Sequence, residues 1–246
     1  MPYNSADSVS VEMRPSSLSG QLLDPQAWQP VLEKYAKAVN LAVSFVDKNG
    51  HCGTIINAKP TWTLVSAKVS SSTGDCGFSL ASHTFCTCAA DAMKNGDAVF
   101  VRDRVRLTHF AIPLALNEQP LGALLGGQVF DQYPDQSVLE HIAREAGLSP
   151  VDVWQVARLE HPVKRATLKV YADLLWVLGD MFLQARYQKL VEERRLAEMT
   201  RLRGDLQERV EELETFEAAV IGRELKMIEL ENQLETLKRQ AKKPQS

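Results

Sequence analysis

The chain has 246 residues, of which 45% are apolar and 24% are charged, and its formal net charge is −3. This is the composition of a globular protein, and the small excess of acidic residues excludes nucleic-acid binding driven by bulk positive charge. With four cysteines and enough length to bury a core, the chain is not a disulfide-stapled mini-protein. It has neither a signal-peptide pattern nor an apolar run of about 18 residues, so we expect a cytoplasmic protein that does not span a membrane.

The composition changes near Arg186. Residues 186–246 contain 13 basic and 13 acidic residues, whereas the first 185 residues contain 15 and 18. No proline lies between Pro162 and Pro244, so this stretch lacks the strongest helix breaker. We therefore predict a flexible arm over 1–20, a compact domain over 21–185, a coiled coil over 186–240 and a disordered tail over 241–246.

Within the compact domain, helical and strand patterns follow one another in irregular order. Asp24 and Pro25 are typical of a helix start, and Asn40 of a helix end. The expected elements are a helix over 25–39, a hairpin of strands 41–46 and 54–56, a loop over 57–77, a helix over 78–95, strands over 98–102, 107–116 and 122–129, short helices over 138–146 and 150–156, and an apolar helix over 164–187. Such an order favours an α+β fold, an antiparallel sheet with flanking helices, over a doubly wound sheet.

The charged segment carries the heptad pattern of a coiled coil when Met199 is placed at position a. The apolar a and d positions are Met199, Leu202, Leu206, Leu213, Phe216, Val220, Met227, Leu230, Leu234 and Leu237. Together these residues form an apolar seam along one side of the helix. Arg209 and Arg223 occupy the other two d positions and weaken this seam. A helix over 165–240 would be roughly 110 Å long, too long for one domain to cover, so we expect a homodimer. The alternative is a single solvated helix.

Two segments of the domain resemble a known family. They are WQPVLEKYAKAVNLAVSFVDKNG and AMKNGDAVFVRDRVRLTHFAIPLALNEQPLGALLGGQVF, and they resemble the PocR-type sensory domain, a PAS-like module of bacterial regulators and sensor kinases. The resemblance implies a PAS-like pocket for a small organic molecule, such as a diol, and a role in two-component signalling. The segment ERVEELETFEAAVIGRELKMIELENQLETL also resembles the coiled segments of sensor kinases. Where many relatives have a Cys-His pair, this chain has Asp103 and Arg104.

Five residues are candidate ligand contacts. They are Cys88, Asp103, Arg104, His109 and Gln128. Cys88 shares a predicted helix face with apolar residues. His109 and Phe110 are neighbours along a predicted strand, so the side chains of His109 and Phe110 point to opposite faces of the sheet. Gln128 follows two adjacent glycines, which permit a bulge or a close approach, and its buried amide would need hydrogen-bond partners. Each of these residues also has a purely structural interpretation.

A second group of side chains has the chemistry of a metal site. Cys76, His83, Cys86 and Cys88 lie within thirteen residues, and thiolate and imidazole are good ligands for zinc or iron. On a helix, however, Cys86 and Cys88 would point about 200° apart, so both can serve one metal only from a loop. The alternative is that these cysteines are ordinary core or loop thiols.

The sequence contains neither a GxSxG elbow nor an HExxH motif nor the set of protein-kinase motifs. We therefore expect a non-catalytic sensor that requires no known cofactor. It would bind a small organic molecule and signal through a dimeric coil to a partner kinase or regulator, without contacting nucleic acid or membrane. The alternatives are a ligand-free scaffold protein and a redox sensor that uses haem or a metal bound by cysteine and histidine.

Overall fold

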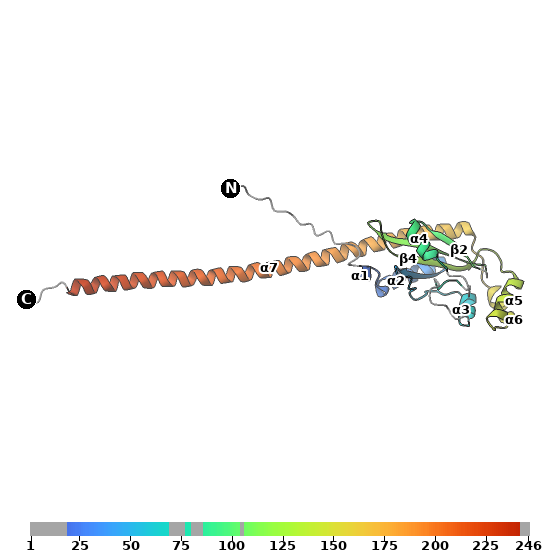
Figure 1. Cartoon of the computed structure of the whole chain (residues 1–246), viewed down its shortest axis with the longest axis horizontal. Coiled ribbons are helices and arrows are strands. Elements are labelled where there is room, and N and C mark those ends of the chain that lie inside the picture. Colours follow the sequence, from blue (N-terminus) through green and yellow to red (C-terminus); the bar gives the residue numbers. More distant parts are fainter. Residues whose placement is uncertain (1–18, 69–76, 80–85, 104–105, 242–246) are drawn as a thin grey trace, which may run out of the picture. The chain divides into compact units, whose positions relative to one another are not determined.

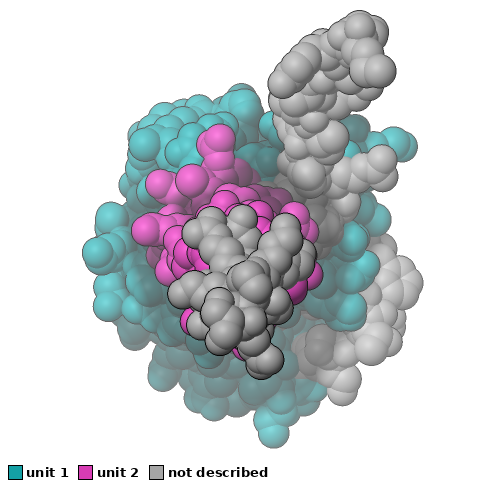
Figure 2. Space-filling view, turned by 90° about the vertical axis from the view of Figure 1, so that its left-hand side faces the viewer, with its two compact units in different colours: residues 1–188 teal, residues 189–246 magenta. Residues whose placement is uncertain are grey.

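The computed structural model describes residues 19–68, 77–79, 86–103 and 106–241, with side chains as far as Leu234. The chain divides into two compact units, residues 1–188 and 189–246 (Figure 2). The arm predicted over 1–20 and the tail predicted over 241–246 lie outside the described residues, apart from Ser19, Gly20 and Ala241, which are helical. Among the described helices, none is both long and apolar enough to cross a lipid bilayer.

The first unit is built on a four-stranded antiparallel sheet. Its strands, drawn as arrows in Figure 1, are β1 at Ala42–Asp47, β2 at Val99–Arg102, β3 at Leu107–Leu116 and β4 at Gln119–Phe130. They lie in the order β1-β4-β3-β2. Asn117 and Glu118 join β3 to β4 with φ values of 49° and 62°, the left-handed backbone that suits a two-residue hairpin. The predicted α+β class, an antiparallel sheet with flanking helices and a long C-terminal helix, is confirmed.

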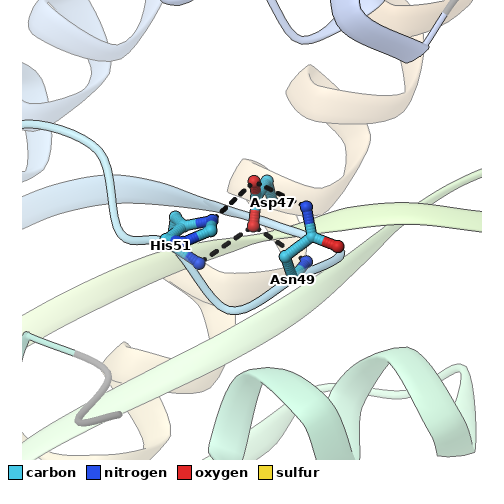
Figure 3. Close-up of polar contacts among 3 residues, drawn as sticks. All are labelled: Asp47, Asn49 and His51. Atoms are coloured by element: carbon cyan, nitrogen blue, oxygen red, sulfur yellow. Dashed lines mark hydrogen bonds and ion pairs between the residues drawn. The ribbon is translucent and has the colours of Figure 1, made fainter. Parts of the chain in front are cut away.

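The turn after β1 forms as predicted, but the return strand over 54–56 is wrong. Asp47 Oδ1 accepts hydrogen bonds from the backbone N–H groups of Asn49 at 2.8 Å and His51 at 2.9 Å (Figure 3). Burial acts to raise the pKa of Asp47, but the hydrogen bonds from His51 and Asn49 outweigh it and lower that pKa. Beyond the turn the chain runs back along the other edge of β1, where it makes only isolated bridges, Val46 with Cys52 and Val43 with Ile56, so no continuous return strand forms.

The helix predicted over 78–95 is also wrong at its described positions before Cys88, namely 78–79 and 86–87, which are not helical. Helix α4 spans Cys88–Asn95 and ends at Gly96, whose φ of 75° matches the predicted cap. Phe78 lies in a bend outside the helix, and residues 80–85 lie outside the described residues. Thr87 is the residue before the helix, and its hydroxyl donates to the Asp91 carboxylate one turn further on at 2.7 Å.

The loop predicted over 57–77 is wrong in part, because it contains helix α3 at Pro60–Ser66. Proline at the first helical position was the available signal. Helix α3 packs with α5 (Gln136–Glu145) and α6 (Pro150–Ala157) around one apolar cluster. The buried members of this cluster are Val65, Leu107, Phe130, Leu139, Ile142, Ala143, Val153 and Ala157.

The two faces of the sheet are covered by different helices. Ala123 and Leu125 of β4 pack in the cluster that contains Cys88 and Ala92 of α4. Leu124 lies between them in sequence and faces helix α7 (Arg165–Ala241), where a Cβ on Gly179 would come within 2.8 Å of it. The sheet is therefore sandwiched between α4 and the first part of α7.

Helix α2 (Pro25–Val39) holds the first part of α7 from the side. The rings of Trp28 and Phe182 meet edge to face at 4.7 Å, and the Tyr35 hydroxyl donates to the carbonyl of Tyr171 at 2.5 Å. Burial raises the pKa of Tyr35, which keeps this phenol protonated as a donor.

The second unit consists of the rest of α7. Of the ten apolar a and d residues predicted for the coil, eight are more than half exposed, Val220 is half-buried, and the Leu237 side chain lies outside the described ones. The predicted long helix is thus confirmed, and its apolar seam is not covered by the chain's own described residues.

Candidate functional site

A β-bulge arises where two glycines precede Gln128. Thr108 pairs with Val129 but His109 pairs with Gly127, so Gln128 is the extra residue of β4, with a φ of 60°. Gly127 has a φ of 140°, and a Cβ there would lie 2.5 Å from the Cα of His109. Glycine therefore allows the close approach of β3 and β4 beside His109, and the bulge predicted from the sequence is confirmed.

The bulge turns the Gln128 side chain toward the start of α3. This side chain is fully buried, and its Oε1 accepts a hydrogen bond from the backbone N–H of Lys59 at 3.1 Å. Its Nε2 has no hydrogen-bond partner within the described part of the chain. A buried amide group that offers a donor suits a polar ligand or a water molecule.

A polar cavity of about 550 Å³ opens beside Lys59. It is lined by Val39, Asn40, Asn57, Ala58, Lys59, Pro60, Val129, Leu159, Glu160, His161, Pro162 and Val163. Lys59 is only 8% exposed, and its Nζ donates to Asn40 Oδ1 at 2.6 Å. Glu160 Oε1 accepts from the backbone N–H of Thr61 at 2.7 Å. The volume and the few convergent polar groups are those of a small-molecule site.

Burial perturbs both charged groups of this cavity. Burial lowers the pKa of Lys59, against the opposing charge of Glu160. Burial likewise raises the pKa of Glu160, and the hydrogen bonds from Thr61 only partly offset it. Both shifts disfavour the charged forms of these side chains, so the cavity suits a neutral ligand with hydroxyl groups better than a strongly charged one.

On the α4 face, the fold brings together two thiols and an imidazole. The ligand atoms of Cys86, Cys88 and His109 all lie within 4.8 Å of one another, and Cys86 Sγ is 3.2 Å from His109 Nε2. Cys88 and His109 are fully buried and Cys86 is half-buried. The ring of Phe78 lies 6.2 Å from that of His109, and five alanines are among the buried residues of the surrounding apolar cluster. This thiol–imidazole cluster has the donor atoms of a soft-metal site.

Comparison of the sequence with known proteins identifies the family of the domain that carries both sites. A family model described as "Sensory domain found in PocR" matches residues 21–187. The chain belongs to the PocR sensory-domain family. This confirms the resemblance seen in the sequence, and no curated protein matches the chain. The PocR chain is also similar to a solved structure, the GAF domain/HD domain protein from Geobacter sulfurreducens, with 10% identity, a TM-score of 0.35, and coverage of 69% of this chain and 98% of that one.

The PocR domain separates residues that the sequence placed in one site. Cys88 and His109 come together on the α4 face, whereas Gln128 contacts Lys59. Asp103 closes the turn between β2 and β3, since its Oδ1 accepts from the backbone N–H of Leu107 at 2.9 Å. Arg104 lies outside the described residues, as do Cys76 and His83 of the predicted metal group.

Lys59 and Glu160 were missed by the sequence analysis. They lie 101 positions apart, and no local pattern links them. Asn40 was recognised only as a helix end, which it is, with a φ of 53°. Its second role, as the acceptor that holds Lys59, depends on contacts between distant segments and leaves no trace in the spacing of residues.

Proposed function

We propose that this chain is a non-catalytic sensor whose PocR domain binds a small polar organic molecule in the Lys59–Glu160 cavity and reports its presence through α7. The observation that carries the proposal is the lining of the cavity. It combines buried polar groups with Pro162 and Val163, which directly precede α7 at Arg165. A ligand there touches the segment from which the long helix begins.

The cavity chemistry favours a short diol or a similar hydroxylated compound. One hydroxyl would accept from the Lys59 ammonium and another would donate to the Glu160 carboxylate. Gln128 supports the cavity wall from behind, because its Oε1 accepts from the backbone N–H of Lys59. Apolar lining from Val39, Val129 and other residues accommodates the carbon chain.

A specific contact offers a route from the cavity to α7. The backbone N–H of Val163 donates to the carbonyl of Phe130 at 2.8 Å, which ties the entry of α7 to the end of β4. Val163 and Val129, the neighbour of Phe130, both line the cavity, so a ligand there would contact both sides of this hydrogen bond. The resulting shift of α7 is a change of population between two arrangements.

The signal would leave the domain through the pairing of α7 with α7 of a second copy. A partner kinase or regulator would recognise the state of this helix pair. Six consecutive a positions from Met199 to Leu234 are apolar, and this 3.5-residue spacing is the spacing that a second helix requires. Exposure of this seam in the single chain supports a partner of the same kind. Arg209 and Arg223 at d positions lower the cost of switching between registers.

Thermal melting of the full chain tests the proposal with ethane-1,2-diol, propane-1,2-diol, acetaldehyde and acetate as probes. A diol should raise the midpoint of wild type, because binding to the folded state alone stabilises it. Lys59→Met should abolish the rise, whereas Lys68→Met, which removes an exposed lysine nearby, should leave it unchanged. No response of wild type to any probe, or equal loss in both variants, would reject the cavity as the sensing site.

A further inference from the structure

The thiol–imidazole cluster exists because α4 starts later than its sequence suggests. Within a continuous helix, Cys86 and Cys88 would point in different directions. Instead Cys88 is the first helical residue and Thr87 before it has φ −93° and ψ 6°, so the chain turns between the two cysteines. Both thiols thereby reach the side chain of His109 on β3.

Distances within the cluster are close to those around one metal ion. Tetrahedral zinc with sulfur at about 2.3 Å and nitrogen at about 2.0 Å separates its ligand atoms by roughly 3.6–3.8 Å. Cys86 Sγ and His109 Nε2 are 3.2 Å apart, and no pair in the cluster exceeds 4.8 Å. The longest separation would need to close by about 1 Å, which a side-chain rotation can supply.

The donor atoms and their surroundings select the ion. Two thiolates and one imidazole prefer a soft or borderline metal, such as zinc or copper(I), over calcium or magnesium. The cluster lies among Phe78, Ala89, Ala111 and other apolar residues, where a net charge is costly. Two thiolates and a neutral imidazole balance the charge of a divalent ion but not that of a monovalent one, which favours Zn²⁺.

We propose that Cys86, Cys88 and His109 bind one Zn²⁺ ion. The ion would join the start of α4 to β3, and a tetrahedral centre would take one further ligand beside these three. The site lies on the α4 face, and it involves none of the residues that line the Lys59–Glu160 cavity. The proposal therefore stands or falls independently of the sensing function.

Cobalt titration of the full chain tests the proposal, because Co²⁺ occupies zinc sites and reports its ligands by absorption. Metal-free, reduced protein should take up one equivalent of Co²⁺ with a thiolate charge-transfer band and the strong visible bands of tetrahedral cobalt, and Zn²⁺ should displace it. Cys86→Ser should weaken binding by about 100-fold or more. Cys52→Ser is the matched control, because Cys52 borders the same apolar cluster but is not part of the metal-ligating group, and it should bind like wild type.

Cys88 and His109 are fully buried, so their variants can fail to fold, and the decisive variant is that of the half-buried Cys86. Alkylation mapped by mass spectrometry gives a second measurement on unaltered protein. Zn²⁺ should protect Cys86 at least tenfold and leave the labelling of Cys52 unchanged. Wild type that shows no charge-transfer band, or Cys52→Ser that binds as weakly as Cys86→Ser, would overturn the assignment.

Discussion

Helix α7 uses the same kind of side chain in two different ways along its length. Leu168, Leu175 and Leu183 in the first unit are fully buried, whereas Leu206 and Leu213 in the second are each 64% exposed. Leu175 and Leu183 lie one turn before and after Gly179, which approaches Leu124 of the sheet, whereas the exposed leucines have no cover within the described chain. Apolar periodicity thus shows which side of a helix needs a partner, but not whether the same chain provides it.

Charges placed in the exposed seam should have the largest effect on the molecule. Leu206→Asp combined with Leu213→Asp should convert the expected dimer into a monomer, because each a position would bring two carboxylates together. The thermal midpoint of the sensory domain should hardly change. Light scattering gives the mass, and Glu211→Asp at an outward f position is the control. A wild-type chain that is already monomeric would contradict the proposed pairing.

Replacing a buried leucine of the first unit by alanine should lower the stability of the domain and leave the pairing of chains unchanged. Leu175→Ala should lower the free energy of unfolding by about 2–5 kcal/mol, since it leaves a cavity against the sheet. The neighbouring Leu174 is 52% exposed, so Leu174→Ala should cost far less. Urea denaturation followed by tryptophan fluorescence measures both, and equal losses would show that α7 does not pack as described.

The two units also contain matched glycines in α7. Gly179→Ala should destabilise by about 1–3 kcal/mol, because the new Cβ would press on Leu124 and Leu114. A Cβ on Gly204 would meet no atom within 4 Å. Gly204→Ala should therefore stabilise the helix by at most about 1 kcal/mol. Helical content and thermal melting, followed by circular dichroism, distinguish the two variants.

The smallest expected effect is on the pH dependence of stability. The first unit contains a partly buried carboxyl group, that of Glu160, whereas the described carboxyl groups of the second unit are exposed. Because the pKa of Glu160 is raised above 4.5 in the folded state, ionisation favours unfolding. Wild-type stability should fall as the pH rises from about 4.5 through this raised pKa, and Glu160→Gln should lack that part of the fall. Urea midpoints measured between pH 4 and pH 7 check the difference, and parallel curves would contradict it.

Much of the fold was accessible from local patterns. The strand Leu107–Leu116 and the cap of α2 were predicted at their observed positions, and so was the glycine that ends α4. Each depends on residues close together in the chain: alternation along a strand, a carboxylate at a helix start, a left-handed residue at a helix end. The family resemblance likewise rests on local features, namely the order and spacing of short motifs.

Sites were less accessible, because each is made of segments that meet only in the folded chain. The return strand expected after β1 is reduced to isolated bridges, and the continuous partner of β1 is β4, which lies far away in the chain. The thiols of Cys86 and Cys88 met His109 only because α4 begins between them. Local sequence thus decides turns, caps and periodicity through short-range sterics and hydrogen bonds. Competition among distant segments to bury apolar surface decides which side chains end up together.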